Sequence, residues 1–193
     1  MRFMLGVDEA GRGPLAGPVS VGIVAVPEGF DVALEFPGVA DSKKLSEKKR
    51  EYLFEMLKNR AVMGDVRFIV EFESTDTIDR EGIAFAVRRA LARGVNVLAP
   101  NSALVKVKLD GALRAPPEYD QETIINGDDL IPIISLASIA AKVLRDRLMC
   151  DLAKQYPEYG FEKHKGYGTK AHYDMLEKHG PCNIHRRSFL HLK

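Results

Sequence analysis

The first two strand-like segments of the chain lie close together in sequence, and this spacing constrains the fold more than any other feature. Residues 3–8 form a short apolar run, and residues 19–26 alternate small and branched apolar side chains, as β-strands do. The segment between them contains Gly11, Gly13 and Gly17 as well as two prolines, a composition typical of a loop. Such closely spaced strands are typical of a hairpin, so the fold is expected to begin with a pair of neighbouring strands.

Helical and strand-like patterns alternate along the rest of the chain. Ser46 is expected to cap a helix that runs to about residue 58, and a second helical pattern at 75–93 is expected to end at Gly94. The longest helical pattern runs from residue 133 to about 155. The other expected segments are strands at 66–72, 104–109 and 122–125, a loop at 156–170 and a short helix at 169–178. This order predicts an α/β fold in which a mixed β-sheet is flanked by helices, with a C-terminal helical region.

Length and composition are those of a folded domain. A chain of 193 residues with 46% hydrophobic and 28% charged residues can bury a normal core, so we expect one domain over residues 1–193, with 156–193 as its C-terminal part. No apolar run approaches the ~20 residues of a membrane span, and no signal peptide is evident. Cys150 and Cys182 do not make a disulfide framework. These features predict a cytoplasmic protein without a membrane association, and the short chain without tryptophan favours a monomer.

The charge of the chain is unevenly distributed. Overall, 28 Lys and Arg stand against 27 Asp and Glu, so the net charge of +1 gives no general indication of nucleic-acid binding. From residue 161 onward there are seven Lys or Arg and three Asp or Glu, and all five histidines lie there. A basic segment beside a slightly acidic remainder fits a protein that binds a polyanion. A solvated, charged chain end has the same pattern, so charge alone leaves both interpretations open.

Acidic residues follow three of the expected strands. Asp8-Glu9 end the first strand, Asp110 ends the strand at 104–109, and Asp128-Asp129 follow the strand at 122–125. A glycine lies near each site and allows the loop to turn closely. If these strands are neighbours, their carboxylates meet at one edge of the sheet, where α/β folds place chemistry. Acids at strand ends are also common turn residues, and that interpretation suffices for any one of the three sites taken alone.

A group of carboxylates needs a cation to offset its mutual repulsion. Mg²⁺ and Mn²⁺ prefer oxygen ligands, and Mg²⁺ retains positions for water and substrate phosphate. Two such ions about 4 Å apart can activate a water molecule and stabilise the leaving oxygen of a phosphodiester. No histidine lies near these acids in sequence, and Cys182-x-x-His185 lacks a partner pair, which argues against zinc. The acids therefore predict phosphodiester chemistry with Mg²⁺ or Mn²⁺.

Four sequence blocks together resemble the ribonuclease HII family, the type 2 ribonucleases H. They read GVDEAGRGPLAGPV at 6–19, DSKKLS at 41–46, SLASIAAKVLRDRLM at 135–149 and HKGYGTKAHYDMLEKHGPCNIHRRSF at 164–189. The resemblance implies a ribonuclease H-like fold. It implies an endonuclease that hydrolyses the RNA strand of RNA–DNA hybrids and cuts 5′ to single ribonucleotides in duplex DNA, leaving 3′-hydroxyl and 5′-phosphate ends. Roles in removing ribonucleotides from DNA and in removing RNA primers follow from the same resemblance.

The resemblance also implies roles for individual residues, where the motifs match. The catalytic, metal-binding acids correspond to Asp8, Glu9, Asp110 and Asp128, with Asp129 as the alternative to Asp128. The positions that correspond to substrate-binding residues are Gly11, Arg12, Gly13, Lys43, Ser138, Lys142 and Tyr167, and Lys44 could serve in place of Lys43. In the family, the GRG run and the tyrosine recognise the junction between a ribonucleotide and the following deoxynucleotide.

A polar stripe on the longest expected helix fits this assignment. Its members, spaced three or four residues apart and so on one helix face, are Ser135, Ser138, Lys142 and Arg145. With two cations beside Asp128, the stripe suits phosphate contacts. A solvated helix face has the same pattern.

Two other functions share some of these features. A broader nuclease or nucleotidyl transferase of the same fold would need the acids but not the GRG run or Tyr167. A catalytically inactive nucleic-acid-binding module would be expected to have lost acids, and none is missing here. The expected partners are RNA–DNA hybrid and ribonucleotide-containing duplex DNA. No C-terminal clamp-binding peptide with paired aromatic residues is evident.

Overall fold

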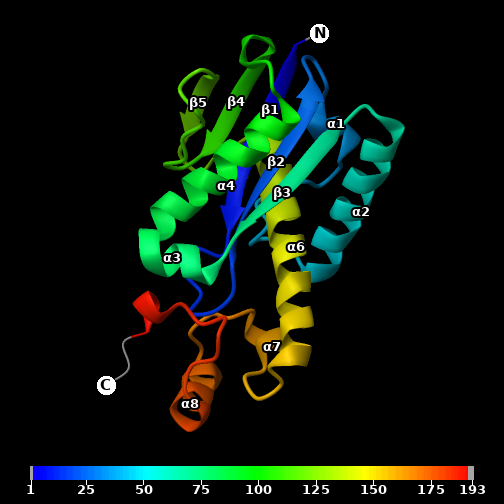
Figure 1. The fold of residues 1–193 in the computed structure, drawn as a ribbon. Helices are drawn as coiled ribbons and strands as arrows, with labels where there is room; N and C mark the ends of the chain where they lie inside the picture. Colours follow the sequence, from blue (N-terminus) through cyan, green and yellow to red (C-terminus); the bar gives the residue numbers. More distant parts are fainter. Residues whose placement is uncertain (1, 191–193) are drawn as a thin grey trace.

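The computed structural model describes residues 2–190, which form a five-stranded sheet with helices on both faces (Figure 1). The strands are β1 (Phe3–Ala10), β2 (Val19–Pro27), β3 (Arg67–Glu73), β4 (Val105–Asp110) and β5 (Asp120–Ile124). Their order across the sheet is β3-β2-β1-β4-β5. β2 is antiparallel to β1 and β3, whereas β4 is parallel to both β1 and β5. The predicted start with two neighbouring strands and the predicted mixed sheet are confirmed.

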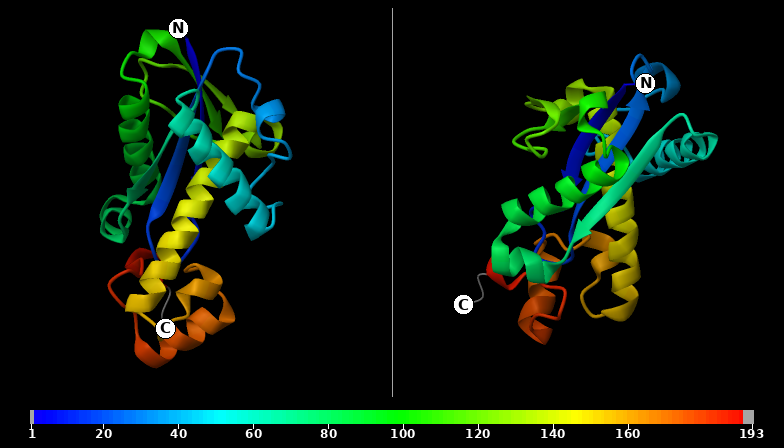
Figure 2. Two further views of the ribbon diagram at one scale, coloured as in Figure 1. Left: turned by 90° about the vertical axis from the view of Figure 1, so that its right-hand side faces the viewer. Right: turned by 45° about the horizontal axis from the view of Figure 1, so that its top comes forward.

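Two helical layers enclose the sheet. The helices are α1 (Val32–Glu35), α2 (Glu47–Met63), α3 (Thr75–Glu81), α4 (Ile83–Leu98), α5 (Gly127–Leu130), α6 (Pro132–Gln155), α7 (Phe161–His164) and α8 (Lys170–His179), with 3-10 turns at Ser102–Leu104 and Arg187–Phe189. One apolar core lies between α4 and the sheet, and a second lies between the other face and the helices α2 and α6. Figure 2 shows α4 and α6 on opposite sides of the strands.

The predicted helix at 75–93 is wrong in two respects. Gly82, with φ of 83°, ends α3 and begins α4, so the segment forms two helices in place of one. Gly94 does not end a helix, because α4 continues to Leu98. Gly94 faces the sheet instead, where an added Cβ would lie 2.2 Å from Cδ1 of Ile23. Here glycine serves close packing of a helix on a strand, and the sequence pattern for a helix end is the same.

Helix α6 crosses the sheet at close range. A Cβ added to Gly6 would lie 2.4 Å from the carbonyl oxygen of Ile133, and one added to Gly22 would lie 2.2 Å from that of Ala137. Because Gly22 pairs with Asp8 across β1 and β2, the crossing point lies next to the first acidic residue. The two glycines therefore bring the polar residues of α6 close to the end of β1.

The C-terminal part packs against the loop between β1 and β2. Its apolar cluster includes Leu15 and Ala16 from that loop together with residues of α6, α7 and α8. Backbone hydrogen bonds join the same regions, from Gly17 N to Ile184 O at 2.8 Å and from Arg186 N to Leu15 O at 2.8 Å. The loop after β1 is therefore held by a segment that lies far along the chain.

No helix among residues 2–190 has both the length and the apolar character needed to cross a membrane. Residues 191–193, at the end where no clamp-binding peptide is expected, lie outside the described residues.

Candidate active site

Three carboxylates from separate elements meet at one edge of the sheet. Asp8 lies in β1, Asp110 is the last residue of the adjacent parallel strand β4, and Asp128 lies in α5. Each offers a carboxylate oxygen, and these oxygens lie within 4.8 Å of one another. Asp8 and Asp128 are buried. The expected convergence is thus seen for Asp8, Asp110 and Asp128, whereas Glu9 and Asp129 are not part of this group.

Backbone hydrogen bonds fix this arrangement. The N–H of Gly111 donates to Ile124 O at 2.9 Å, so the chain turns tightly after Asp110. The N–H of Asp128 donates to the Asp110 carboxylate at 3.2 Å, and Ser135 Oγ donates to Asp128 O at 2.7 Å. The carboxylates therefore approach one another because α5 and the start of α6 are tied to the ends of β4 and β5.

Asp128 and Asp129 lie in different surroundings. Asp128 belongs to the buried group and accepts a hydrogen bond from Lys43 Nζ at 3.0 Å. Asp129 is exposed and pairs with Lys44 Nζ at 2.6 Å. The geometry favours Asp128 over Asp129 as a metal ligand, and it favours Lys43 over Lys44 as the lysine nearer to the acids.

The electrostatics of the group also favour a bound cation. Burial, and then the charge of Glu9, raise the pKa of Asp8 from 3.8 to about 8. Burial raises the pKa of Glu9 as well, although Arg12, at 3.3 Å from the Glu9 carboxylate, opposes this shift. A divalent cation would remove the penalty of holding these charges together. Because the donors are carboxylate oxygens, without histidine or cysteine, they fit Mg²⁺ or Mn²⁺.

The raised pKa of Asp8 predicts how pH affects the metal-free protein. Between pH 3.8 and about 8 the folded state holds a proton that the unfolded chain has released, so stability falls as the pH rises through this window. In EDTA, we expect the Tm of the protein to fall from pH 5 to pH 8 relative to that of Asp8→Asn. Added Mg²⁺ should raise the Tm more at pH 8 than at pH 5. Parallel Tm curves for the two proteins in EDTA would contradict this explanation.

A cavity of about 230 Å³ lies beside the acids. The predicted site residues that line it are Asp8, Glu9, Gly11, Arg12, Gly13, Lys43, Asp110, Ser138, Lys142 and Tyr167, and Ala10 and Ser42 complete the lining. Asp128 joins them through its contacts with Asp110 and Lys43. The structure therefore brings every predicted site residue into one place, although they come from distant parts of the chain.

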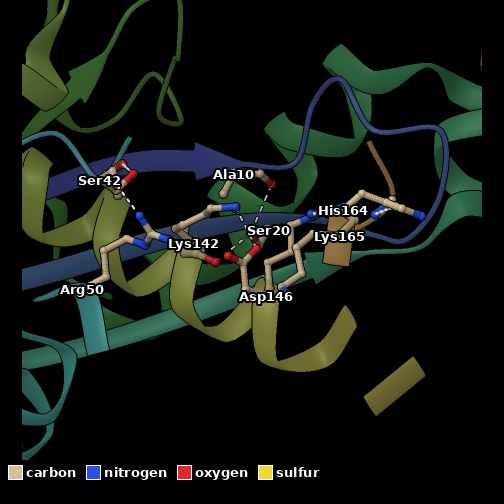
Figure 3. Close-up of polar contacts among 12 residues, drawn as sticks. Ala10, Ser20, Ser42, Arg50, Lys142, Asp146, His164 and Lys165 are labelled. Atoms are coloured by element: carbon tan, nitrogen blue, oxygen red, sulfur yellow. Dashed lines mark hydrogen bonds and ion pairs between the residues drawn. The ribbon is translucent and has the colours of Figure 1, made fainter. Parts of the chain in front are cut away.

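Polar side chains around the middle of α6 form hydrogen bonds and an ion pair with one another and with their neighbours (Figure 3). Ser138 Oγ lies 2.8 Å from Ser42 Oγ, and Arg50 donates to Ser42 O at 2.9 Å. Lys142 Nζ donates to Asp146 at 2.8 Å and lies 5.7 Å from the ring centre of Tyr167. Ser42 and Asp146 were not predicted as site residues. Ser42 lies within the DSKKLS block directly before Lys43, which was a usable signal.

The polar stripe of α6 is only partly a substrate-facing surface. Arg145 is fully buried and donates to the carbonyl oxygens of Pro18, Ala16 and Lys165. Ser135 is buried and holds Asp128. The prediction that Arg145 suits a phosphate contact is therefore wrong, because the β1–β2 loop and the loop after α7 cover this part of the helix.

Comparisons with known proteins point to one family. The model of the family described as Ribonuclease HII matches residues 5–192. The ribonuclease HII of Endomicrobium trichonymphae is 48% identical over 95% of this chain and 83% of its own length. The ribonuclease HII of Burkholderia thailandensis is 46% identical over 97% of this chain and 83% of its own length. The ribonuclease HII of Bacillus cytotoxicus is 43% identical over 99% of this chain and 70% of its own length.

Comparison with solved structures leads to related ribonucleases H as well. Ribonuclease H2 of Pyrococcus horikoshii is 28% identical, with a TM-score of 0.70 over 96% of this chain and 93% of its own. Two further structures show the same fold at lower identity. The ribonuclease HII of Archaeoglobus fulgidus, solved in a PCNA complex, has a TM-score of 0.77 at 23% identity, covering 99% and 96% of the two chains. Bst-RNase HIII, solved in complex with Mn²⁺, has a TM-score of 0.64 at 18% identity, and the match covers 93% of this chain and 63% of its own. The chain belongs to the ribonuclease HII family of metal-dependent ribonucleases H, which act on RNA–DNA hybrids, and has their ribonuclease H-like fold.

Proposed function

We propose that this enzyme, besides hydrolysing RNA in hybrids, cuts 5′ to single ribonucleotides in duplex DNA and leaves 3′-hydroxyl and 5′-phosphate ends. The observation that supports this is the shared cavity, in which the acids lie directly beside Gly11-Arg12-Gly13 and Tyr167. An enzyme that cleaves at one sugar must read that sugar next to its reaction centre. Removal of ribonucleotides and RNA primers from DNA in the cytoplasm, by a single-domain monomer, is the corresponding biological role.

The acids would hold the metal and position the scissile phosphate. Asp8, Asp110 and Asp128 form the group of converging carboxylates, and Glu9 lies beside it, paired with Arg12. A bound Mg²⁺ or Mn²⁺ would supply the means to activate a water molecule and to stabilise the leaving oxygen. Lys43, at 3.0 Å from the Asp128 carboxylate, places a positive charge at the mouth of the cavity.

Lys142 and Ser138, which also line the cavity, would bind the substrate backbone. Lys142 lines the cavity and is held by Asp146, so its ammonium group is already oriented before substrate arrives. Ser138 lies on the same face of α6, bonded to Ser42. Phosphate contacts from these residues would position the duplex without reading its sequence.

The sugar would be read by backbone groups and one aromatic ring. A 2′-hydroxyl can donate and accept, and backbone groups in a glycine loop can approach it closely. Tyr167 is 42% exposed, and its ring lies near Lys142 and Arg145. A ring held in this way can pack on the deoxyribose that follows the ribonucleotide, where a 2′-hydroxyl would clash.

A cleavage assay tests the proposal. The substrates are a long RNA–DNA hybrid, duplex DNA with one ribonucleotide, and the same duplex entirely of DNA, each with Mg²⁺ or Mn²⁺. We expect cleavage of the first two and a product with a 3′-hydroxyl end 5′ to the ribonucleotide. Equal cleavage of the all-DNA duplex would favour a broader nuclease. Binding without cleavage in either metal would favour an inactive binding module.

Tyr167→Ala is expected to lower cleavage at a single ribonucleotide by about tenfold more than cleavage of the long hybrid, since aromatic stacking on a nucleotide is worth about 1–3 kcal/mol. The measurement is kcat/KM on both substrates. Tyr167→Phe retains the ring and should retain the selectivity. Tyr52→Ala, which removes an exposed tyrosine of α2, controls for the loss of an aromatic side chain. Equal losses on both substrates would argue against a junction-reading role for Tyr167.

A further inference from the structure

Two arginines are fully buried without an acidic partner. Arg145 of α6 and Arg186 of the C-terminal segment have no exposed surface, and within residues 2–190 neither forms an ion pair with a carboxylate. Burial lowers the pKa of Arg186 to about 9, with the charge of Arg145 adding to the effect. Asp146 and Asp79 act on these charges only at longer range and are bound elsewhere, by Lys142 and by backbone N–H groups.

Backbone carbonyl groups take the place of acids. Arg186 donates to the carbonyl oxygens of Gly11 at 2.7 Å, Arg12 at 2.8 Å and Gly17 at 2.9 Å. Arg145 donates to those of Pro18 at 2.9 Å, Ala16 at 3.2 Å and Lys165 at 3.1 Å. Five of these six acceptors belong to the loop between β1 and β2, which contains the GRG run. The two guanidinium groups therefore bind this loop from its inner side.

The same contacts determine which groups of the loop remain for a ligand. With the carbonyl groups of Gly11 and Arg12 bound inward, the N–H groups of Arg12 and Gly13 donate to no backbone acceptor within residues 2–190. Both residues line the cavity beside the acids. The N–H groups of Arg12 and Gly13 are thus available as hydrogen-bond donors to whatever enters the cavity.

Arg145 also joins this loop to the one that carries Tyr167. Its third hydrogen bond goes to Lys165 O, two residues before Tyr167, and its guanidinium carbon lies 5.9 Å from the centre of the Tyr167 ring. Leu15 N donates to Gly166 O at 2.8 Å, which ties the two loops directly. One buried side chain therefore connects both elements to which the proposed function assigns sugar recognition.

The fit between arginine and loop depends on glycine. Gly11 has φ of +87°, and a Cβ there would lie 2.0 Å from Nε of Arg145. The guanidinium group packs directly on the backbone of the loop, with no room for a side chain. Gly11 is thus needed for the arginine contact as well as for the approach of a sugar.

Stability alone does not explain two buried cations. A buried charge without a counter-ion is costly, and apolar residues of similar size are often the more stable choice at such positions. An acidic partner would stabilise the arginines, but it would also place a negative charge behind a cavity that accepts a polyanion. Carbonyl acceptors satisfy the guanidinium groups and leave their positive charge uncancelled, which favours phosphate nearby.

We infer that Arg145 and Arg186 are positioning residues that hold the GRG loop and the Tyr167 loop in the arrangement that reads a ribonucleotide junction. This inference rests on the proposed function. It assigns the two arginines no contact with substrate, because neither is exposed.

The test uses Arg145→Lys and Arg186→Lys, which keep the charge but cannot donate to three carbonyl groups in one plane. Hydrogen exchange measured by mass spectrometry should show faster exchange in peptides covering residues 11–18 and 164–168 of the folded variants. The ratio of kcat/KM for a single ribonucleotide to that for a long hybrid should fall about tenfold, because small misplacements of a reading element are costly in rate. Leu176→Ala, a cavity variant in the same C-terminal cluster, should lower the Tm and leave the ratio unchanged.

Two outcomes would overturn the inference: unchanged exchange in both peptides, or a ratio that is lowered as much by Leu176→Ala as by the lysine variants. If a lysine variant does not fold, the other one carries the test, since each arginine binds the loop independently. Cleavage by the wild-type enzyme distinguishes a failure of the proposed function from a failure of the positioning role of the arginines. If it cuts hybrids but not single ribonucleotides, the proposed function fails, whereas the exchange measurement still decides whether the arginines position the loops.

Discussion

Asp8→Asn is expected to lower hybrid cleavage by about a thousandfold or more, because a metal ion supplies several kcal/mol of transition-state stabilisation and each ~1.4 kcal/mol is a factor of ten. The amide offers one neutral oxygen where the carboxylate offered a charged one. Asp8 offers a carboxylate oxygen to the same group as Asp110 and Asp128, so the substitution removes one charged donor from this group. Single-turnover cleavage with saturating Mg²⁺ and with Mn²⁺ measures the effect.

The same variant should fold at least as well as the wild type. Burial, and then the charge of Glu9, disfavour the ionised form of Asp8 and raise its pKa, so a neutral amide at this position avoids that cost in the metal-free protein. Asp129→Asn is the matched control, since Asp129 lies next to the group but is exposed and paired with Lys44. It should retain nearly full activity. Wild-type rates for Asp8→Asn, or a larger loss for Asp129→Asn, would show that the reaction centre lies elsewhere.

Gly22→Ala is expected to destabilise the protein by about 3 kcal/mol, at the upper end for overpacking, and to lower the Tm by about 6–12 °C. The added Cβ would lie 2.2 Å from the carbonyl oxygen of Ala137 and 3.1 Å from Ala141 N. Both contacts are to the backbone of α6, so no side-chain rotation can relieve them. Thermal and urea unfolding in EDTA measure the loss without a contribution from metal.

Gly64→Ala serves as the control for this prediction. Gly64 has φ of +88° and open space around it, so alanine there introduces backbone strain of about 1 kcal/mol but no overlap. A cost for Gly22→Ala no larger than that for Gly64→Ala would mean that α6 can move away from the sheet without difficulty.

Local patterns predicted most elements but not the features that depend on packing. Ser46 caps α2 as expected, because an N-cap serine acts within one turn of its helix. The end of the helix at Gly94 was predicted wrongly, since only the tertiary structure shows that this glycine faces Ile23. The order of strands could not be derived either, because β4 pairs with a strand about a hundred positions away.

The residues of the candidate site also fall into those that local sequence patterns predict and those whose role depends on tertiary packing. The meeting of acids from Asp8-Glu9, Asp110 and Asp128-Asp129 could be predicted because strand ends and glycines mark them in sequence, whereas the choice of Asp128 over Asp129 came from the family resemblance. Arg145 was misjudged, since helical spacing tells which residues share a face but not what covers that face. Arg186 lies in the fourth block of the resemblance, but its partners could not be predicted, because its acceptors are carbonyl groups, which every residue possesses.

The position of β1 in the middle of the sheet has a consequence for biosynthesis. β1 and β2 can pair as soon as both have left the ribosome, but the other neighbour of β1 is β4, at Val105–Asp110. A nascent chain that has not reached residue 128 carries Asp8 without Asp128, and one that has not reached residue 110 lacks Asp110 as well. Closing so large a loop is also slow compared with forming local contacts. The group of three acids is therefore assembled late, and the growing chain acquires the proposed nuclease centre only after most of the protein has been made.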